Sequence, residues 1–250
     1  MPIAFLILIF AIVLVFSGIT AMAGIGAAFL FVPVFYYLGI PLSEAVPTAL
    51  LLNTVSLSMA AYNYWRGKLI NWSVALPMLV AAVIFSPIGA RLTPYVDKRL
   101  LLGLFAGFLL FAGSMMLFYH TQRKPVRLTT GAKVGTAGVG AFAGFLGGLL
   151  GVGGGNFILP VLNWIGLDPK IAVGTTSIIV ITSSLSGFLG HATMGRMSPA
   201  FLVMTCLAAV IGSWLGSQLM KTKVSGKQLK KIIGVVLLVI AVKMAMDVFK

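Results

Sequence analysis

The feature that most constrains this chain is a series of eight apolar runs, each about the length of a helix that crosses a lipid bilayer. A hydrocarbon core of about 30 Å needs about 20 apolar residues in helical conformation. The runs occur at residues 3–22, 45–64, 72–92, 100–119, 133–150, 171–190, 199–219 and 232–249. The sequence therefore predicts an all-α polytopic membrane protein.

Two shorter apolar segments, 27–39 and 156–166, interrupt this series. As helices they would reach only about 17–20 Å of the roughly 30 Å core. Each follows a glycine cluster, and the second cluster lies within GLLGVGGGNFILP, residues 148–160. Glycine weakens a helix by roughly 1 kcal/mol relative to alanine, and an unpaired backbone group in hydrocarbon costs several kcal/mol. Glycine clusters are therefore costly within a membrane, which suggests that they have a function there.

Composition and charge exclude several other classes of protein. With 60% hydrophobic and 9% charged residues, the chain lacks the polar surface of a soluble domain. A net charge of +14 would suggest nucleic-acid binding in a soluble protein, but here Lys and Arg lie in short gaps between apolar runs, where membrane orientation explains them. We expect the lipid bilayer, and no nucleic acid, among the partners.

Motifs for catalysis, cofactors or metals are missing from the sequence. The stretch GVGGGN at 151–156 lacks the last glycine of a dinucleotide fingerprint, and no Gly-Lys-Ser/Thr follows it. Two histidines, one cysteine and four acidic residues give no spacing typical of a metal site. We expect no enzymatic activity, no cofactor and no bound metal.

The two halves of the chain match when the first is shifted by 127 residues. Glycine and proline coincidences carry most of the weight, because apolar residues match by chance more readily. The shift pairs Gly24 with Gly151, Gly26 with Gly153, Pro33 with Pro160 and Gly39 with Gly166. We interpret residues 1–122 and 123–250 as two homologous transmembrane repeats, each with four long helices and one short helix after a glycine-rich break.

Duplication with short, Gly/Pro-interrupted segments at corresponding positions is typical of secondary transporters, whose substrate site lies between the repeats near mid-membrane. Broken helices are tolerated at that depth only where the freed backbone is buried in protein or lines a polar cavity, and the N-terminus of a helix there offers unpaired N–H groups to an anion. We therefore predict a central anion site at Gly24, Gly26, Gly153, Gly154, Gly155 and Asn156. The alternative is that glycines only permit close helix contact, and we prefer that interpretation for Gly140, Gly144, Gly147 and Gly148.

Polar side chains within the apolar runs supply further candidates for anion binding. Asn53 lies in one run, and Thr175, Thr176 and Ser177 lie in its repeat partner. The alternative is that such hydroxyl groups bond back to their own helix. Arg91 ends a run and has no charged repeat partner, so we expect it either to recruit anions at the mouth or to anchor the helix at the interface.

The segments GIGAAFLFVPVFYYLGIPLSEAVPTALLLN and GFLGGLLGVGGGNFILPVLNWIGLDPKIAVGTTS resemble the two halves of the TauE/SafE sulfite exporter family. The resemblance covers nearly the whole chain. It implies transport of small sulfur-containing oxyanions or organosulfonates across a bacterial cytoplasmic membrane. The first half has GIGAAF where the second has GVGGGNF, so we expect unequal half-sites, of which the second dominates.

The distribution of Lys and Arg favours one of two topologies. If the short segments re-enter and return, eight basic residues lie on one side and nine on the other. If each short segment, with its flanking chain, carries the backbone across, the count becomes twelve against five. The positive-inside rule prefers the second topology, which makes the repeats inverted and places both termini outside.

We conclude from the sequence that the chain is a carrier in the inner membrane, which moves a small anion by alternating access. An anion-selective channel that uses the same site as a filter is the alternative. The exact anion, the direction, the coupling ion and the oligomeric state, including a homo-oligomer, stay open.

Overall fold

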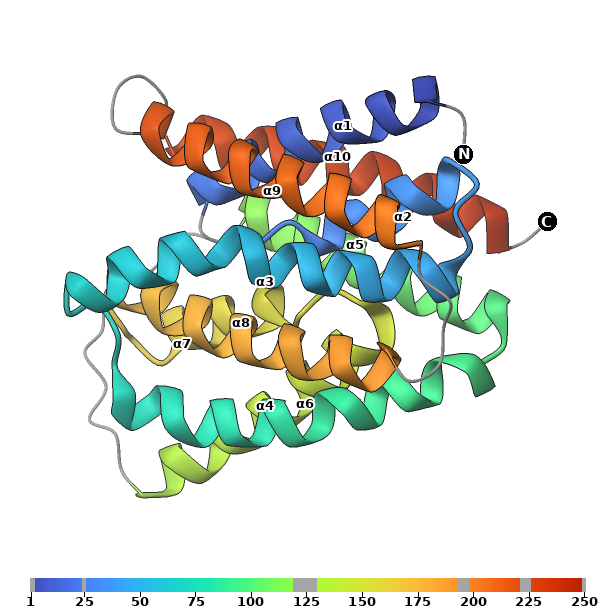
Figure 1. Ribbon diagram of the computed structural model, residues 1–250. Helices are drawn as coiled ribbons and strands as arrows, with labels where there is room; N and C mark the ends of the chain where they lie inside the picture. The colour runs from blue at the N-terminus through green and yellow to red at the C-terminus, as the bar shows by residue number, and fades with distance from the viewer. Residues whose placement is uncertain (1–2, 24–25, 119–129, 193–197, 221–225, 249–250) are drawn as a thin grey trace.

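The computed structural model describes residues 3–23, 26–118, 130–192, 198–220 and 226–248. All regular secondary structure in these residues is helical. The elements are α1 (Ile3–Ala23), α2 (Ala28–Tyr37), α3 (Leu42–Arg66), α4 (Trp72–Leu92), the 3₁₀ turn η1 (Thr93–Tyr95), α5 (Lys98–Phe118), α6 (Thr130–Leu150), α7 (Gly155–Trp164), α8 (Pro169–Ala192), α9 (Pro199–Met220) and α10 (Gly226–Val248) (Figure 1).

Helix lengths in the described residues follow the sequence-based prediction. Eight helices have 21 to 25 residues, whereas α2 and α7 have ten each and span about 15 Å. On length and composition, five described helices can cross a membrane: α3, α4, α5, α8 and α9. The described apolar parts of α1 and α6, Phe5–Ala21 and Gly135–Leu150, are shorter. A multi-pass membrane architecture is therefore confirmed, and five of the eight predicted spans meet these two requirements.

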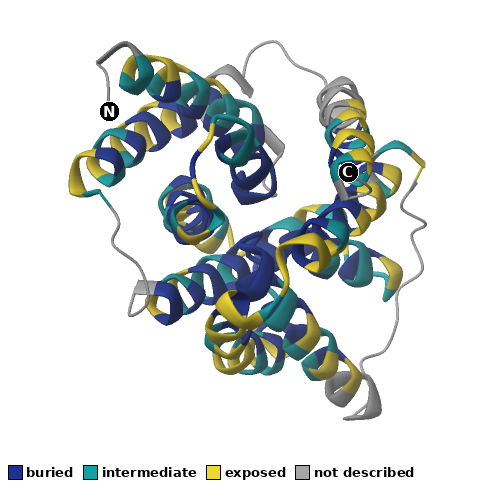
Figure 2. Cartoon of the chain, turned by 90° about the vertical axis from the view of Figure 1, so that its right-hand side faces the viewer, coloured by how far each residue is buried: buried dark blue, intermediate teal, exposed yellow. Residues whose placement is uncertain are grey.

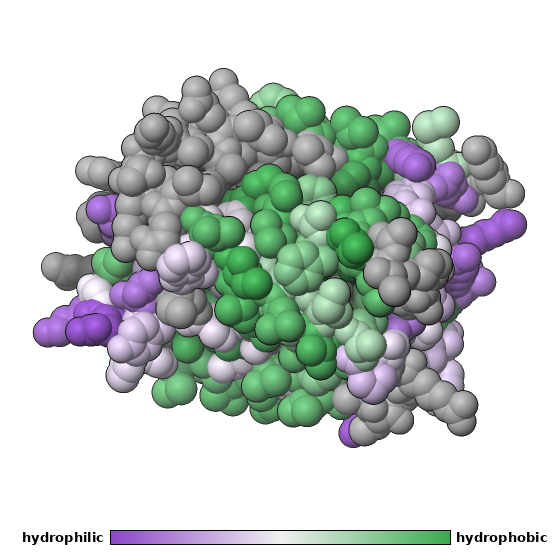
Figure 3. All heavy atoms as spheres, turned by 45° about the horizontal axis from the view of Figure 1, so that its top comes forward, coloured by the Kyte–Doolittle hydropathy of each residue, from purple (hydrophilic) through white to green (hydrophobic). Residues whose placement is uncertain are grey.

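The surface has the pattern expected of a protein surrounded by lipid. Large apolar side chains on the long helices are exposed, among them Ile84, Leu189 and Val239. Hydrophobic atoms form a broad band across the middle of the molecule, and hydrophilic atoms gather at its two ends (Figure 3). Seen along the long helices, buried residues face inward and exposed residues outward (Figure 2). Such a large apolar band fits contact with a bilayer rather than with water.

Helices of the first half pack mainly against helices of the second half. α1 packs against α9 and α6 packs against α4, while α3 contacts α8 and α5 contacts α10. The starts of α6, α7, α8 and α9 each follow those of α1, α2, α3 and α4 by 127 residues. These bounds fit the offset in the sequence, although the predicted boundary between residues 122 and 123 lies outside the described residues.

Glycines bring the α4 and α6 backbones together, as predicted for close helix contact. A side chain at Gly144 would meet the backbone of Ala82 at 2.6 Å, and Gly140 and Gly148 face the α4 backbone in the same way. Gly147 differs from this prediction, because it faces the backbone of Gly154 rather than another long helix. The α4–α6 pair thereby fixes the position of the glycine-rich chain that follows α6.

Candidate functional site

The two helix breaks meet at one buried amide side chain on α3. Asn53 is fully buried, and a side chain at Gly26 would collide with its Oδ1 atom. A side chain at Gly153 would collide with Ser184 and would meet the Asn53 Nδ2 atom at 2.5 Å. Because Gly26 and Gly153 lie 127 residues apart, equivalent positions of the two halves face the same amide.

Asn53 pairs with the backbone donors at the first break and links this break to α8. Its Oδ1 atom accepts hydrogen bonds from the N–H groups of Ala27 at 2.9 Å and Ala28 at 3.5 Å. Its Nδ2 atom donates to the Oγ atom of Ser184 at 2.9 Å. The start of α2, which would otherwise carry unpaired donors, therefore already holds a protein oxygen.

The second break forms because three glycines adopt a backbone conformation that other residues rarely reach. Gly151 has φ +73° and ends α6, and the Val152 N–H then donates back to the Gly147 carbonyl at 3.0 Å. Gly153 and Gly154 follow with φ +70° and +74°, which turns the chain into α7. Gly153 thereby faces Asn53 of α3 and Ser184 of α8, and we call the place where these two side chains meet the α3–α8 crossing.

The start of α7 has donors without acceptors. Among the described residues, the backbone N–H groups of Gly155 and Asn156 form no hydrogen bond. The Asn156 Nδ2 atom is also buried and unpaired. On α8, Thr176 is fully buried with an unpaired Oγ1 atom, one turn before Val180, which lies against Gly153. Buried unpaired donors are costly, so this end of α7 is suited to bind an anion.

The structure assigns different surroundings to the predicted glycines of the second break. Gly153 faces the polar crossing, but Gly154 faces α6, where a side chain would meet the Ala143 carbonyl oxygen at 2.5 Å. A larger residue at Gly154 would therefore disturb the packing of the break against α6. Gly155 is the first residue of α7, and its N–H is one of the donors at the start of this helix.

Two predicted hydroxyl groups bond away from the break. The Oγ1 atom of Thr175 accepts a hydrogen bond from the Asn71 N–H at 3.0 Å and so fixes the start of α4. The Oγ atom of Ser177 donates to the Val173 carbonyl of its own helix at 2.8 Å. Of the three neighbouring candidates on α8, only Thr176 has an unpaired oxygen.

Of the other two predicted residues, Arg91 and Gly24, the structure describes only Arg91. Arg91 is exposed near the end of α4. Gly24 lies outside the described residues.

Ser184 is a site residue that the sequence-based prediction did not select. It is fully buried and accepts the Asn53 hydrogen bond across the two halves. Its repeat equivalent is Leu57, and the equivalent of Asn53 is Val180. Asn53 and Ser184 are therefore both polar residues whose repeat equivalents are apolar. This difference between the two halves is the sequence signal that could have identified both residues.

A family model with the description "Sulfite exporter TauE/SafE" matches residues 8–244. The chain belongs to the TauE/SafE sulfite exporter family. Because this is a family of membrane transporters, the TauE/SafE chain is not an enzyme. No solved structure matches it significantly.

Curated relatives of this TauE/SafE chain come from bacteria, archaea and plants. "Probable membrane transporter protein YdhB" of Bacillus subtilis is 27% identical over 198 residues, which is 77% of this chain and 81% of the relative. "Probable membrane transporter protein MJ0441" of Methanocaldococcus jannaschii is 27% identical over 227 residues, 84% of each chain. "Sulfite exporter TauE/SafE family protein 1" of Arabidopsis thaliana is 33% identical over 79 residues, 32% of this chain and 18% of the relative.

The different surroundings of Gly153 and Gly154 generate a prediction. Substitution by alanine at either position incurs the cost of a positive φ, but in Gly153→Ala the new methyl group meets mainly side-chain atoms of Asn53 and Ser184, which can move. We therefore expect lost anion binding with little destabilisation beyond that shared cost. In Gly154→Ala the methyl group meets the α6 backbone, so we expect a clearly larger fall in melting temperature, in line with overpacking costs of about 1–3 kcal/mol. Thermal melts and calorimetric titration of both purified variants test this. Equal melting temperatures, or full binding by Gly153→Ala, would contradict the assignment.

Proposed function

We propose that the protein is a secondary carrier that binds a small anion at the N-terminus of α7, beside the α3–α8 crossing. The observation that carries the proposal is the contrast between the two breaks. The N–H groups at the start of α2 already have the Asn53 oxygen, whereas those of Gly155 and Asn156 have no acceptor among the described residues. This contrast also supports the expectation that the second half-site dominates.

The proposed substrates are sulfur-containing oxyanions such as sulfite or organosulfonates. Support comes from the family and from the chemistry of the donors. The backbone N–H groups of Gly155 and Asn156, the Asn156 amide and the Ser184 hydroxyl are neutral groups in buried surroundings. Several neutral donors, together with the positive end of a helix, suit the oxygen atoms of a compact anion.

Complete burial of the crossing favours a carrier over the channel alternative. Asn53, Thr176 and Ser184 are all fully buried, so the centre is closed in this conformation. A channel filter would need a continuous open path. In the proposed cycle, the Asn53–Ser184 hydrogen bond between α3 and α8 breaks and re-forms as the two halves move around the anion.

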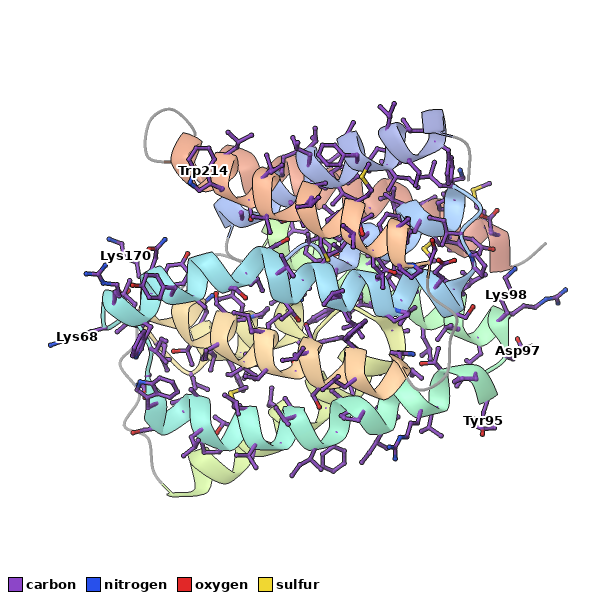
Figure 4. The ribbon with its side chains drawn as sticks, in the orientation of Figure 1. Lys68, Tyr95, Asp97, Lys98, Lys170 and Trp214 are labelled. Carbon is purple, nitrogen blue, oxygen red and sulfur yellow. The ribbon has the colours of Figure 1, made fainter. Side chains whose placement is uncertain are left out.

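We also propose that the halves are inverted repeats in a bacterial inner membrane. α1 begins and α10 ends at the same end of the bundle, and α2 and α7 lie toward opposite ends (Figure 1). Lys68 and Lys170 lie at one end, and Tyr95, Asp97 and Lys98 lie at the other (Figure 4). By the positive-inside rule, the end that carries Lys68 and Lys170 faces the cytoplasm.

Cysteine labelling in intact cells tests this orientation. In a Cys206→Ser background, we expect Tyr95→Cys to react with a membrane-impermeant maleimide from outside, and Lys170→Cys to react only after the cells are opened. The re-entrant topology places both positions on one side of the membrane. Equal labelling of both variants in intact cells would therefore reject the inverted arrangement.

Uptake into proteoliposomes tests the site itself. Asn156→Asp places a carboxylate where the anion binds, and like charges about 4 Å apart repel by about 4 kcal/mol at an effective dielectric constant of about 20. We expect affinity for the transported anion to fall at least a hundredfold, because this repulsion opposes the anion in every bound state. A screen of sulfite, thiosulfate, sulfate and sulfoacetate, with trans-stimulation by internal substrate, identifies the anion and distinguishes a carrier from a channel.

Asn163→Asp is the matched control for this experiment. Asn163 is a buried amide with an unpaired Oδ1 atom near the opposite end of the same helix. We expect it to retain affinity within about threefold, since it is on the order of 10 Å farther along α7. Equal losses in the two variants, or normal uptake by Asn156→Asp, would remove the proposed site.

A further inference from the structure

A cavity of about 710 Å³ opens at the end of the bundle that carries Tyr95, Asp97 and Lys98. Its walls come from the α2–α3 turn, η1, the start of α5 and the end of α8. These elements belong to both halves of the chain. The cavity is separate from the buried crossing, because none of the residues assigned to the crossing lines it.

His191 and Thr93 form the floor of this cavity, and both bond to the end of α6, directly before the second break. His191 forms a 3.0 Å hydrogen bond with the Gly148 carbonyl through Nε2, and Thr93 donates to the Leu149 carbonyl at 3.0 Å. Both His191 and Thr93 line the cavity. The C-terminus of a helix repels anions through its unpaired carbonyl groups. Here two side chains cover those carbonyls, so the floor no longer presents them to the cavity.

The charge at the rim comes from Lys98, the first residue of α5. Lys98 lines the cavity, and its Nζ atom lies 5.3 Å from the centre of the Tyr36 ring on α2. Within the described residues it forms no ion pair.

Three acidic groups near this end already accept hydrogen bonds. Asp97 accepts from the Arg99 N–H at 2.8 Å, Glu44 from the Ser198 N–H at 3.2 Å, and Asp247 from the Tyr37 hydroxyl at 2.9 Å. None of these carboxylates lines the cavity. Arg91 does not line the cavity either.

We propose that this cavity is an antechamber, a second anion-binding site in which Lys98 holds the anion before it passes the His191–Thr93 floor toward α7. The inference rests on the proposed anion transport. It adds a binding site, with a cation, to a central site built from neutral donors.

Charged thiol reagents test the antechamber in detergent, where the direction of insertion has no influence. In Cys206→Ser protein, Ser43→Cys places a thiol in the cavity wall, because Ser43 lines the cavity and is exposed. Its reaction rates with the anionic sulfonatoethyl and cationic trimethylammonioethyl methanethiosulfonates are compared at low ionic strength. For a reagent that reacts within about 7 Å of a unit charge in water, the Coulomb energy changes each rate by about threefold, in opposite directions. We expect Lys98→Gln to lower the anion-to-cation rate ratio by about tenfold.

Arg99→Gln is the matched control, since it removes the same charge from the next residue of α5, which does not line this cavity. We expect Arg99→Gln to change the ratio by less than twofold. We also expect sodium sulfate or sodium methanesulfonate, at constant ionic strength, to slow labelling of Ser43→Cys at least twofold in a Lys98-dependent manner. Equal effects of the two substitutions, or no protection by either anion, would overturn the antechamber.

Proteoliposome uptake separates this inference from the proposed function. If uptake is normal and saturable but Lys98 has no effect on protection, the antechamber proposal is rejected and the carrier proposal stands. If protection depends on Lys98 but no tested anion is taken up, the carrier proposal is rejected and the anion site at the cavity stands. Protection together with a Michaelis constant raised by Lys98→Gln but not by Arg99→Gln supports both.

Discussion

Backbone donors that are buried in a membrane protein need acceptors, and this requirement governs the centre of the fold. An unpaired N–H group in hydrocarbon costs several kcal/mol, so a helix that starts inside the bundle must find an oxygen for its first donors. α2 finds one in the Asn53 amide, which also reaches Ser184 on α8. α7 finds none among the described residues. The same constraint thus separates one break whose donors are satisfied from one with unpaired donors, where we propose that the anion binds.

The asymmetry between the breaks comes from two substitutions at equivalent positions. Where α3 has Asn53 and Leu57, α8 has Val180 and Ser184. Asn53 therefore satisfies the start of α2, and no equivalent asparagine satisfies the start of α7. In the proposed cycle, the Asn53–Ser184 hydrogen bond is the contact that changes. In this proposed cycle, the donors at α7 gain a partner when the anion binds, and an anion drives the cycle by binding one conformation more tightly than the other.

The sequence predicted the helices well because apolar length and glycine clusters report directly on membrane spans. The run 72–92 coincides with α4, and the short segments differ from α2 and α7 by no more than two residues at either end. Site residues were less predictable. Whether Gly153 or Gly154 faces the crossing depends on backbone dihedral angles, and Thr175 bonds to Asn71, which is 104 residues away. Sequence spacing along one helix contains neither kind of information.

Anomalous diffraction from crystals soaked in selenite tests the central claim most directly, because selenite has the shape and charge of sulfite and selenium locates it. The account predicts an anomalous peak within hydrogen-bond reach of the N–H groups of Gly155 and Asn156, adjacent to Ser184. Asn53 should remain on the start of α2. A selenite ion bound at α2 in place of the Asn53 oxygen, or a saturated crystal with no peak at α7, would contradict the account.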